Sequence, residues 1–231
     1  MLLNNSVGKP PQPKMYLYRD YKHLARLFYS GAVFVAFDTE TTGLHSETDY
    51  LMEVGAIKFT CNGEISRFDQ LIKPPIPILP FLTNLTHITN EMVKDCPSAS
   101  KVLPDFLRFI GDKNAVLLAH NAPFDLGFLN AELVRMSVPT IHNQCIDTLP
   151  LARWAYPKFI NETEKGPYKL QSLAKRFDIQ VLAAHRADDD ARVLMELFKR
   201  IIKDTIPRQK DFDMHSQSGN LMPQNIQLEL F

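Results

Sequence analysis

The stretch Ala32-Val-Phe-Val-Ala-Phe-Asp38-Thr-Glu40-Thr-Thr-Gly43 decides the class of fold. An uninterrupted apolar run of this kind is typical of a central strand that is buried on both faces of a sheet. Side chains alternate along a strand, so Asp38 and Glu40 are expected to point one way and Thr39 the other. A strand end with two solvated acids would show the same pattern, so this pair alone does not decide the function.

The elements around this strand predict a mixed α/β protein. Asn62-Gly63 is a strong hairpin signal between two of the expected strands. Strands alternate with helices after that hairpin, which favours a five-stranded mixed sheet flanked by helices. We expect the other strands at 53–59, 65–72, 115–119 and 145–148, and helices at about 16–30, 98–110, 123–136, 148–156, 169–177 and 187–202.

Length and charge limit the organisation of the chain and its mode of binding. A chain of 231 residues fits one domain with tails. We expect an N-terminal extension over 1–30, a catalytic domain over 31–204 and a polar, flexible tail over 205–231. Lys and Arg number 26, as do Asp and Glu, so the net charge is zero. This balance argues against a protein that coats nucleic acid through bulk positive charge, but it does not exclude an enzyme that binds one end of a strand.

Cysteine usage and hydropathy indicate a reducing, aqueous compartment. The chain has 3 cysteines without paired spacing, which argues against a disulfide scaffold and a cysteine-based zinc site. No apolar run is long enough to span a membrane, and the first residues do not resemble a secretory signal. We therefore expect a cytoplasmic protein with no membrane partner.

Two further acids lie in line with the apolar stripes of helices. Asp125 precedes Phe128, Leu129 and Leu133 at helical spacing, and Asp190 bears the same relation to Leu194, Leu197, Phe198 and Ile201. A carboxylate that faces a core is costly unless it is paired or binds a metal ion. Stabilisation of a helix N-terminus is the alternative for Asp125, and Asp188 and Asp189 are expected to support the start of their helix in that way.

Asp38, Glu40, Asp125 and Asp190 together predict a divalent metal centre. The three segments that carry them are expected to meet at one end of the sheet, where the carboxylates would repel one another. Oxygen ligands with open positions suit two ions of Mg²⁺ or Mn²⁺, the arrangement used for in-line attack on phosphodiesters. His185, just before the last helix, could accept the proton of the attacking water.

The same segments resemble a known family. Asp38-Thr-Glu-Thr-Thr-Gly43, His120-Asn-Ala-Pro-Phe-Asp125 and His185-x-x-x-x-Asp190 are similar to the three motifs of the DnaQ-like (DEDDh) 3′→5′ exonucleases, which include proofreading subunits of bacterial DNA polymerase III. The resemblance covers about residues 31–202 and includes Leu85-Thr-His-Ile-Thr-Asn-Glu-Met-Val93. It implies a ribonuclease-H-like fold.

The resemblance also implies roles for individual residues. Asp38 is expected to bridge both metal ions, and Glu40 and Asp190 to bind the ion that activates water. Asp125 is expected to support the second ion, and His185 to act as the general base.

Three residues are expected to bind substrate. Thr41 and Leu44 resemble positions that line the pocket of the 3′-terminal nucleotide. His87 stands where the family pattern usually has glycine, which suits a positive φ or a close approach of substrate. His87 could stack on the terminal base, and a plain surface histidine is the alternative.

The chain ends in a motif for a protein partner. Gln227-Leu-Glu-Leu-Phe231 resembles the peptide by which bacterial proteins bind the sliding clamp. Leu230 and Phe231 would fill an apolar pocket, Leu228 would assist, and Gln227 would make polar contacts. Folding back onto the domain is the alternative.

These observations predict an enzyme that releases nucleoside 5′-monophosphates from DNA 3′ ends in proofreading or clamp-linked repair, in company with a replicative polymerase subunit. Two alternatives stay open. An exoribonuclease of the same family would use the same metal ligands and differ in its contacts to the 2′-OH. A non-catalytic adaptor between polymerase and clamp would not need the acids.

Overall fold

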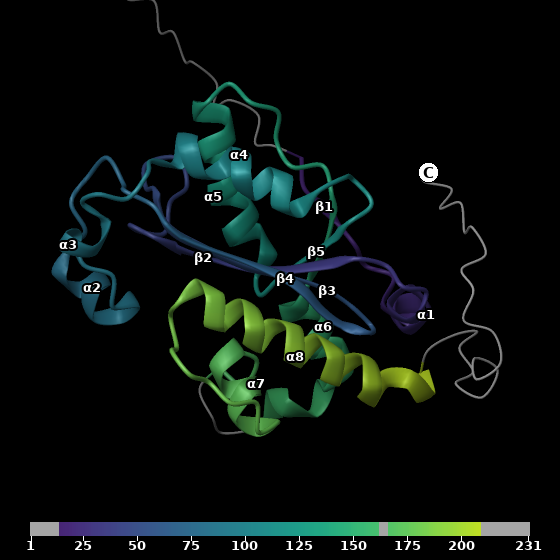
Figure 1. Cartoon of the computed structure of the whole chain (residues 1–231). Coiled ribbons are helices and arrows are strands. Elements are labelled where there is room, and N and C mark those ends of the chain that lie inside the picture. Colours follow the sequence, from purple (N-terminus) through teal and green to yellow (C-terminus); the bar gives the residue numbers. More distant parts are fainter. Residues whose placement is uncertain (1–13, 162–165, 209–231) are drawn as a thin grey trace, which may run out of the picture.

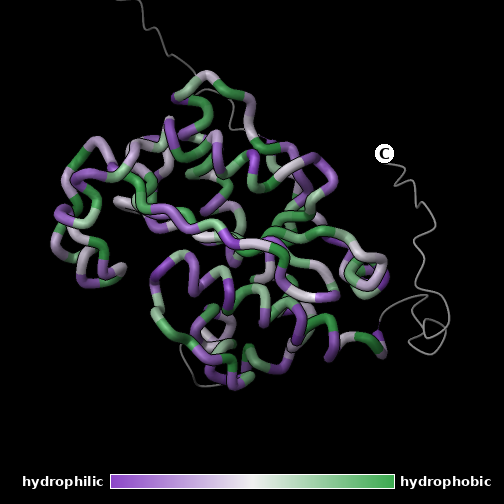
Figure 2. The backbone as a smooth tube through the Cα atoms, in the orientation of Figure 1, coloured by the Kyte–Doolittle hydropathy of each residue, from purple (hydrophilic) through white to green (hydrophobic). Residues whose placement is uncertain are grey.

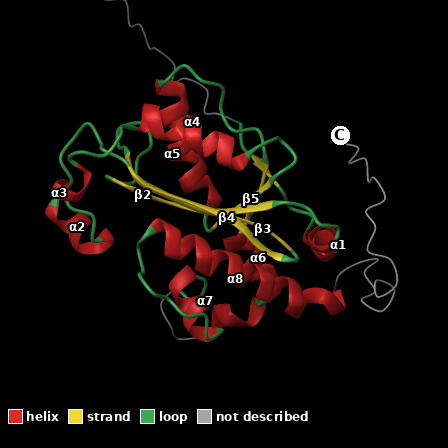
Figure 3. Cartoon of the chain, in the orientation of Figure 1, coloured by secondary structure: helices red, strands yellow, loops and turns green. Residues whose placement is uncertain are grey.

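A six-stranded mixed sheet runs through the middle of the part of the chain that the computed structural model describes, residues 14–161 and 166–208 (Figures 1 and 3). Its strands are β1 (Tyr16–Leu17), β2 (Phe34–Thr41), β3 (Leu51–Thr60), β4 (Gly63–Leu71), β5 (Val116–Ala119) and β6 (Gln144–Asp147).

The strand order is β1-β6-β5-β2-β3-β4. Neighbouring strands from β1 to β2 are parallel, whereas β3 is antiparallel to β2 and to β4. A mixed sheet flanked by helices is thus confirmed, but the expected number of five strands was wrong. The additional strand, β1, has 2 residues and is too short to show an apolar pattern, so it was included in an expected helix over 16–30.

Helices cover both faces of the sheet (Figure 1). They are α1 (Leu24–Tyr29), α2 (Pro80–Thr86), α3 (Asn90–Val93), α4 (Ala99–Ile110), α5 (Ala122–Arg135), α6 (Thr148–Ala155), α7 (Leu170–Arg176) and α8 (Ala187–Thr205), with 3₁₀ turns at Tyr21–His23, Pro157–Asn161 and Ile206–Arg208. Sequence analysis did not predict α2 and α3. No helix among the described residues is long and apolar enough to cross a membrane.

The alternation along β2 assigns its side chains to two cores. Phe34 and Ala36 pack with α8, whereas Val35 and Phe37 pack with α4 and α5 on the other face. Figure 1 shows these two helical layers on opposite sides of the sheet. Hydrophilic and hydrophobic segments alternate along α8 in Figure 2, as expected for a helix with one buried face.

Residues 14–30, which we expected to lie outside the catalytic domain, contribute to its interior. Leu24, Ala25 and Phe28 are buried in the core that α8 also joins. Tyr16 and Leu17 pair with β6. The described part of the expected N-terminal extension is therefore integrated into the sheet and its core.

The start of α8 lies directly on β3. A Cβ atom added at Gly55 would come within 2.1 Å of the carbonyl carbon of Ala187 and 2.2 Å of the nitrogen of Asp188. Both obstacles are backbone atoms, so they cannot move aside without displacing the helix. Only glycine lets α8 approach this closely, and this approach positions the first turn of α8 relative to β2.

We expect Gly55→Ala to destabilise the protein by about 1–3 kcal/mol or more, because the new methyl group would push α8 away from the sheet. Denaturant unfolding followed by circular dichroism measures this change. Gly127→Ala, in α5, is the control: its Cβ would meet nothing closer than 3.7 Å, and alanine favours a helix by about 1 kcal/mol over glycine. Equal stability of the two variants would contradict the close packing at Gly55.

Candidate active site

The carboxylates of β2 lie on the face that α8 covers. Asp38 and Glu40 follow Phe34 and Ala36 at intervals of two residues, so they share that face. Asp38 pairs in register with Gly55, and Glu40 with Glu53. The end of β2 therefore brings both acids next to the part of β3 on which the first turn of α8 rests.

Asp125 approaches from the opposite face. After β5 the chain turns at Asn121, whose φ of 70° is left-handed, and α5 begins at Ala122. The Oδ1 atom of Asp125 accepts hydrogen bonds from the backbone nitrogen of Thr39 at 3.1 Å and from its hydroxyl at 2.8 Å. Thr39 points away from its two acidic neighbours, as expected, and this orientation lets it hold Asp125.

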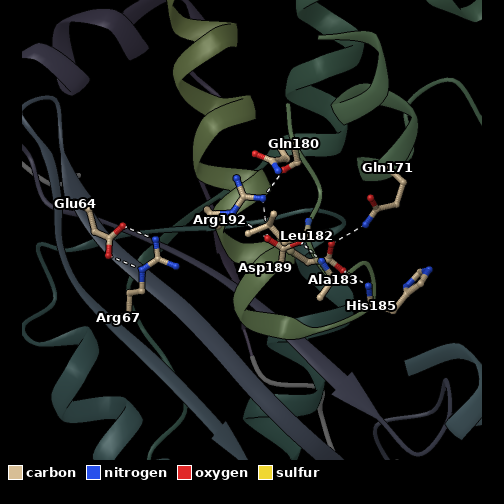
Figure 4. Close-up of polar contacts among 10 residues, drawn as sticks. Glu64, Arg67, Gln171, Gln180, Leu182, Ala183, His185, Asp189 and Arg192 are labelled. Carbon is tan, nitrogen blue, oxygen red and sulfur yellow. Dashed lines mark hydrogen bonds and ion pairs between the residues drawn. The ribbon is translucent and has the colours of Figure 1, made fainter. Parts of the chain in front are cut away.

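Asp190 and His185 come from α8 and the loop before it. The Nε2 atom of Gln171 donates to Oδ1 of Asp190 at 2.6 Å. The backbone nitrogen of His185 donates to Oδ2 of the same carboxylate at 3.0 Å. Figure 4 shows Gln171 and His185 on one side of the first turn of α8. These two contacts fix the carboxylate of Asp190. His185 takes part through its backbone nitrogen and not through its imidazole ring.

The structure brings the predicted residues together. Candidate ligand atoms of Glu40, His185 and Asp190 all lie within 4.8 Å of one another. Asp38 lies close enough to Asp125, Asp190 and Glu40 for each of these carboxylates to raise its pKa. All five residues predicted to be catalytic thus meet at the end of β2.

The electrostatics of this cluster oppose ionisation. Burial raises the pKa of Asp38 well above its usual range, and the charges of Asp125, Asp190 and Glu40 raise it further. Burial, with Asp190 and Glu53 next in effect, raises the pKa of Glu40 to about 9. Burial raises the pKa of Asp125 to about 7, against the effect of the hydrogen bonds from Thr39. Burial also raises the pKa of Asp190.

This donor set fits divalent cations. Four carboxylates that disfavour their own ionisation become stable as anions when a positive charge lies among them. Their oxygen atoms are the ligands that Mg²⁺ and Mn²⁺ prefer. His185 is the one nitrogen donor of the cluster of described residues, and hard cations favour it less as a ligand. Its ring has no hydrogen-bond partner among residues 14–161 and 166–208, which suits it better to accept a proton.

Sequence reasoning missed the residues that orient these carboxylates. Thr39 could have been assigned from strand alternation, because it had to face α5. Nothing in the sequence around Gln171 indicates its contact with Asp190. His120 lies within the second motif, and its Nε2 atom donates to the carbonyl oxygen of Tyr168 at 2.8 Å. Its Nδ1 atom shares a hydrogen bond of 2.9 Å with Oγ1 of Thr148. It joins β5 to neighbouring segments.

The residues expected to bind substrate differ in exposure. Thr41 is buried, and its hydroxyl donates to the carbonyl of Gly43 at 2.6 Å. The side chain of Leu44 is 77% exposed beside it. His87 is exposed and ends α2 with a left-handed φ of 60°. That conformation is the one in which glycine is favoured, which agrees with the glycine of the family pattern.

The tail lies outside the described residues from position 209 onwards. The predicted clamp contacts of Gln227, Leu228, Leu230 and Phe231 therefore stay predictions.

We expect Asp38→Asn to stabilise the metal-free protein. Because the carboxyl pKa values are raised on folding, the unfolded chain releases protons first, and stability falls as the pH rises from about 4 through the raised values near 7 and 9. Removing one charge should gain about 1 kcal/mol near pH 8, or about 2–4 °C in Tm. Thermal unfolding in the presence of a chelator measures it.

The matched control is Asp95→Asn, since Asp95 is exposed and distant in sequence from the cluster. It should leave the Tm unchanged. A lower Tm for Asp38→Asn in chelator near pH 8 would contradict the repulsion among the carboxylates.

Comparisons with known proteins agree with this geometry. Residues 35–198 match the exonuclease family model of the RNase T type. The chain is 43% identical over 188 residues to DNA polymerase III subunit epsilon of Treponema pallidum, covering 81% of this chain and 85% of that protein. It is 41% identical over 170 residues to a PolC-type DNA polymerase III of Caldanaerobacter subterraneus, covering 74% of this chain but 12% of that longer protein.

Solved structures show the same architecture. Exonuclease X in complex with 5′ overhanging duplex DNA matches with a TM-score of 0.57 and 27% identity, covering 74% of this chain and 91% of that chain. Exonuclease I of E. coli in complex with a dT13 oligonucleotide matches in fold, with a TM-score of 0.66 and 21% identity, over 77% of this chain and 42% of that chain. With its ordered acidic motifs, this chain belongs to the DnaQ-like exonuclease family and is an exonuclease.

Proposed function

We propose that the protein is a 3′→5′ exodeoxyribonuclease that releases nucleoside 5′-monophosphates and serves replication proofreading or clamp-linked repair. The observation that carries the proposal is the meeting of Asp38, Glu40, Asp125 and Asp190 with His185 at the end of β2. The similarity to a polymerase III epsilon subunit supports a role in replication. It also supports a replicative polymerase subunit as a partner.

The four carboxylates would hold two divalent cations, Mg²⁺ or Mn²⁺, which supply an activated water molecule and neutralise charge that develops on the phosphate. Thr39 and Gln171 orient two of these carboxylates through the hydrogen bonds described above. His185 accepts the proton of the attacking water through its ring. The carboxylates thus bind metal ions, Thr39 and Gln171 orient carboxylates, and His185 accepts a proton.

The terminal nucleotide would lie against the segment that follows β2. The exposed side chain of Leu44 offers an apolar surface to a base, and the buried Thr41 fixes the turn that presents it. His87 adds an exposed ring that could stack on the terminal base. These contacts recognise a strand end and explain how a chain of zero net charge could select it.

Digestion of single-stranded DNA and RNA oligonucleotides of one sequence tests this proposal. With Mg²⁺ present, we expect degradation of DNA from the 3′ end and a clear preference over RNA. Asp38→Ala should reduce the rate by about 100- to 1,000-fold or more, and His185→Ala by about 100- to 10,000-fold. Preferential digestion of RNA would make the protein an exoribonuclease, and inactivity on both substrates would favour the adaptor.

We also propose that the tail binds a bacterial sliding clamp, on the basis of the Gln227–Phe231 motif. A tether of this kind would raise the effective concentration of the enzyme at DNA, which its neutral charge does not do. Deleting 227–231 should abolish clamp binding in a pull-down or calorimetric titration and leave hydrolysis of short free oligonucleotides unchanged. Asn225→Ala, just outside the motif, is the control. Undiminished clamp affinity after the deletion would refute the proposal.

A further inference from the structure

The loop that carries His185 lies outside any helix or strand and needs external support. It joins α7 to α8, and His185 itself has a left-handed φ of 61°. A non-glycine residue in that conformation persists only where its surroundings impose it. Two further buried acids, beside the four carboxylates of the cluster, impose it here, one on each side of His185.

Asp189 fixes the part of the loop before His185. Its Oδ2 atom accepts hydrogen bonds from the backbone nitrogens of Leu182 at 2.7 Å and Ala183 at 2.8 Å. Its Oδ1 atom accepts from Arg192 at 2.7 Å, and Arg192 also donates to the carbonyl of Gln180. Figure 4 shows these contacts converging on the first turns of α8. Sequence analysis predicts only that Asp189 supports the start of its helix. The structure shows that it also binds the loop before His185.

Glu53 fixes the part of the chain after His185. It lies on β3 and is completely buried. Its Oε1 atom accepts from Nη2 of Arg186 at 2.6 Å and from Nε at 3.0 Å. Its Oε2 atom accepts from the backbone nitrogen of Ala187 at 2.9 Å. Arg186, next to His185, is therefore joined to the sheet by a forked ion pair. Ala187 is joined to it through its backbone nitrogen.

The sheet register shows why Glu53 can perform this task. Glu53 lies directly opposite Glu40, so both side chains leave the sheet on the α8 face. Gly55 allows the backbone of Ala187 to rest on β3 at the next position of that face. Both oxygen atoms of Glu53 are used by Arg186 and Ala187, whereas Glu40 lies near His185 and Asp190. The two opposite glutamates therefore have different surroundings.

We propose that Glu53, through Arg186 and Ala187, is a positioning residue for His185, holding the imidazole at the carboxylate cluster. This inference rests on the proposed function, in which His185 accepts the proton of water. Glu53 itself touches neither the substrate nor the water. Its effect on the reaction should therefore depend entirely on the presence of the imidazole.

A double-mutant cycle tests this dependence. The rate constant for hydrolysis of a DNA oligonucleotide is measured in single-turnover experiments for the wild type, Glu53→Gln, His185→Ala and the double variant. We expect Glu53→Gln to lower the rate constant by about 10- to 100-fold, because a small displacement of a catalytic group is costly. In the His185→Ala background the same change should have no further effect. The DNA concentration that gives the half-maximal rate should be unchanged.

Controls separate positioning from other effects. Glu196→Gln removes a surface acid of α8 that pairs with Lys199 and should leave the rate constant unchanged. If Glu53→Gln does not fold, Arg186→Lys carries the same test, because it keeps the charge and loses the forked contact. Its loss should have the same direction and should vanish in the His185→Ala background.

The outcomes that overturn the proposal are distinct. Full additivity of the Glu53→Gln and His185→Ala losses would show that Glu53 does not act through His185, and would leave the proposed function intact. A changed Mg²⁺ requirement in Arg186→Lys, which keeps the charge of Glu53, would show that this contact acts on the carboxylate cluster instead. Undiminished activity of His185→Ala would refute the assigned role of His185 and, with it, the positioning proposal.

Discussion

Mutual repulsion among four carboxylates shapes the end of the sheet at which they meet. Asp38, Glu40, Asp125 and Asp190 meet at one end of the sheet, and burial together with their proximity opposes ionisation of each. Such a cluster is unfavourable for folding unless a compensating charge occupies it. The fold therefore has to supply rigid support for groups that would otherwise move apart.

That support comes from both faces of the sheet. The buried core around β2 fixes Asp38 and Glu40, and Thr39 reaches through to Asp125 on the opposite side. On the α8 face, Gly55 and Glu53 hold the first turn of the helix that presents Asp190. Both oxygen atoms of Glu53 are used by Arg186 and Ala187, whereas the four carboxylates of the cluster face one another. This separation of structural from reactive carboxylates explains how one small region can contain so many.

Sequence predicted the parts of this arrangement that rest on local pattern. The apolar runs at 32–37 and 115–119 indicated β2 and β5, and helical spacing placed Asp125 and Asp190 on buried faces. The support from Glu53 gave no local signal, because its partner Arg186 lies 133 residues away along the chain. The 2-residue strand β1 was missed because it depends on pairing with β6 rather than on its own residues.

Equilibrium binding of Mn²⁺ to the protein without nucleic acid tests most directly whether the carboxylate cluster exists to hold divalent cations. Calorimetric titration near pH 8 should show binding that weakens as the pH is lowered towards 6, because protons compete for the same oxygens. Asp38→Asn should abolish or strongly weaken that binding. If Asp38→Asn binds Mn²⁺ with unaltered affinity and without dependence on pH, the carboxylate cluster is not the metal site, and any Mn²⁺ binds elsewhere on the protein.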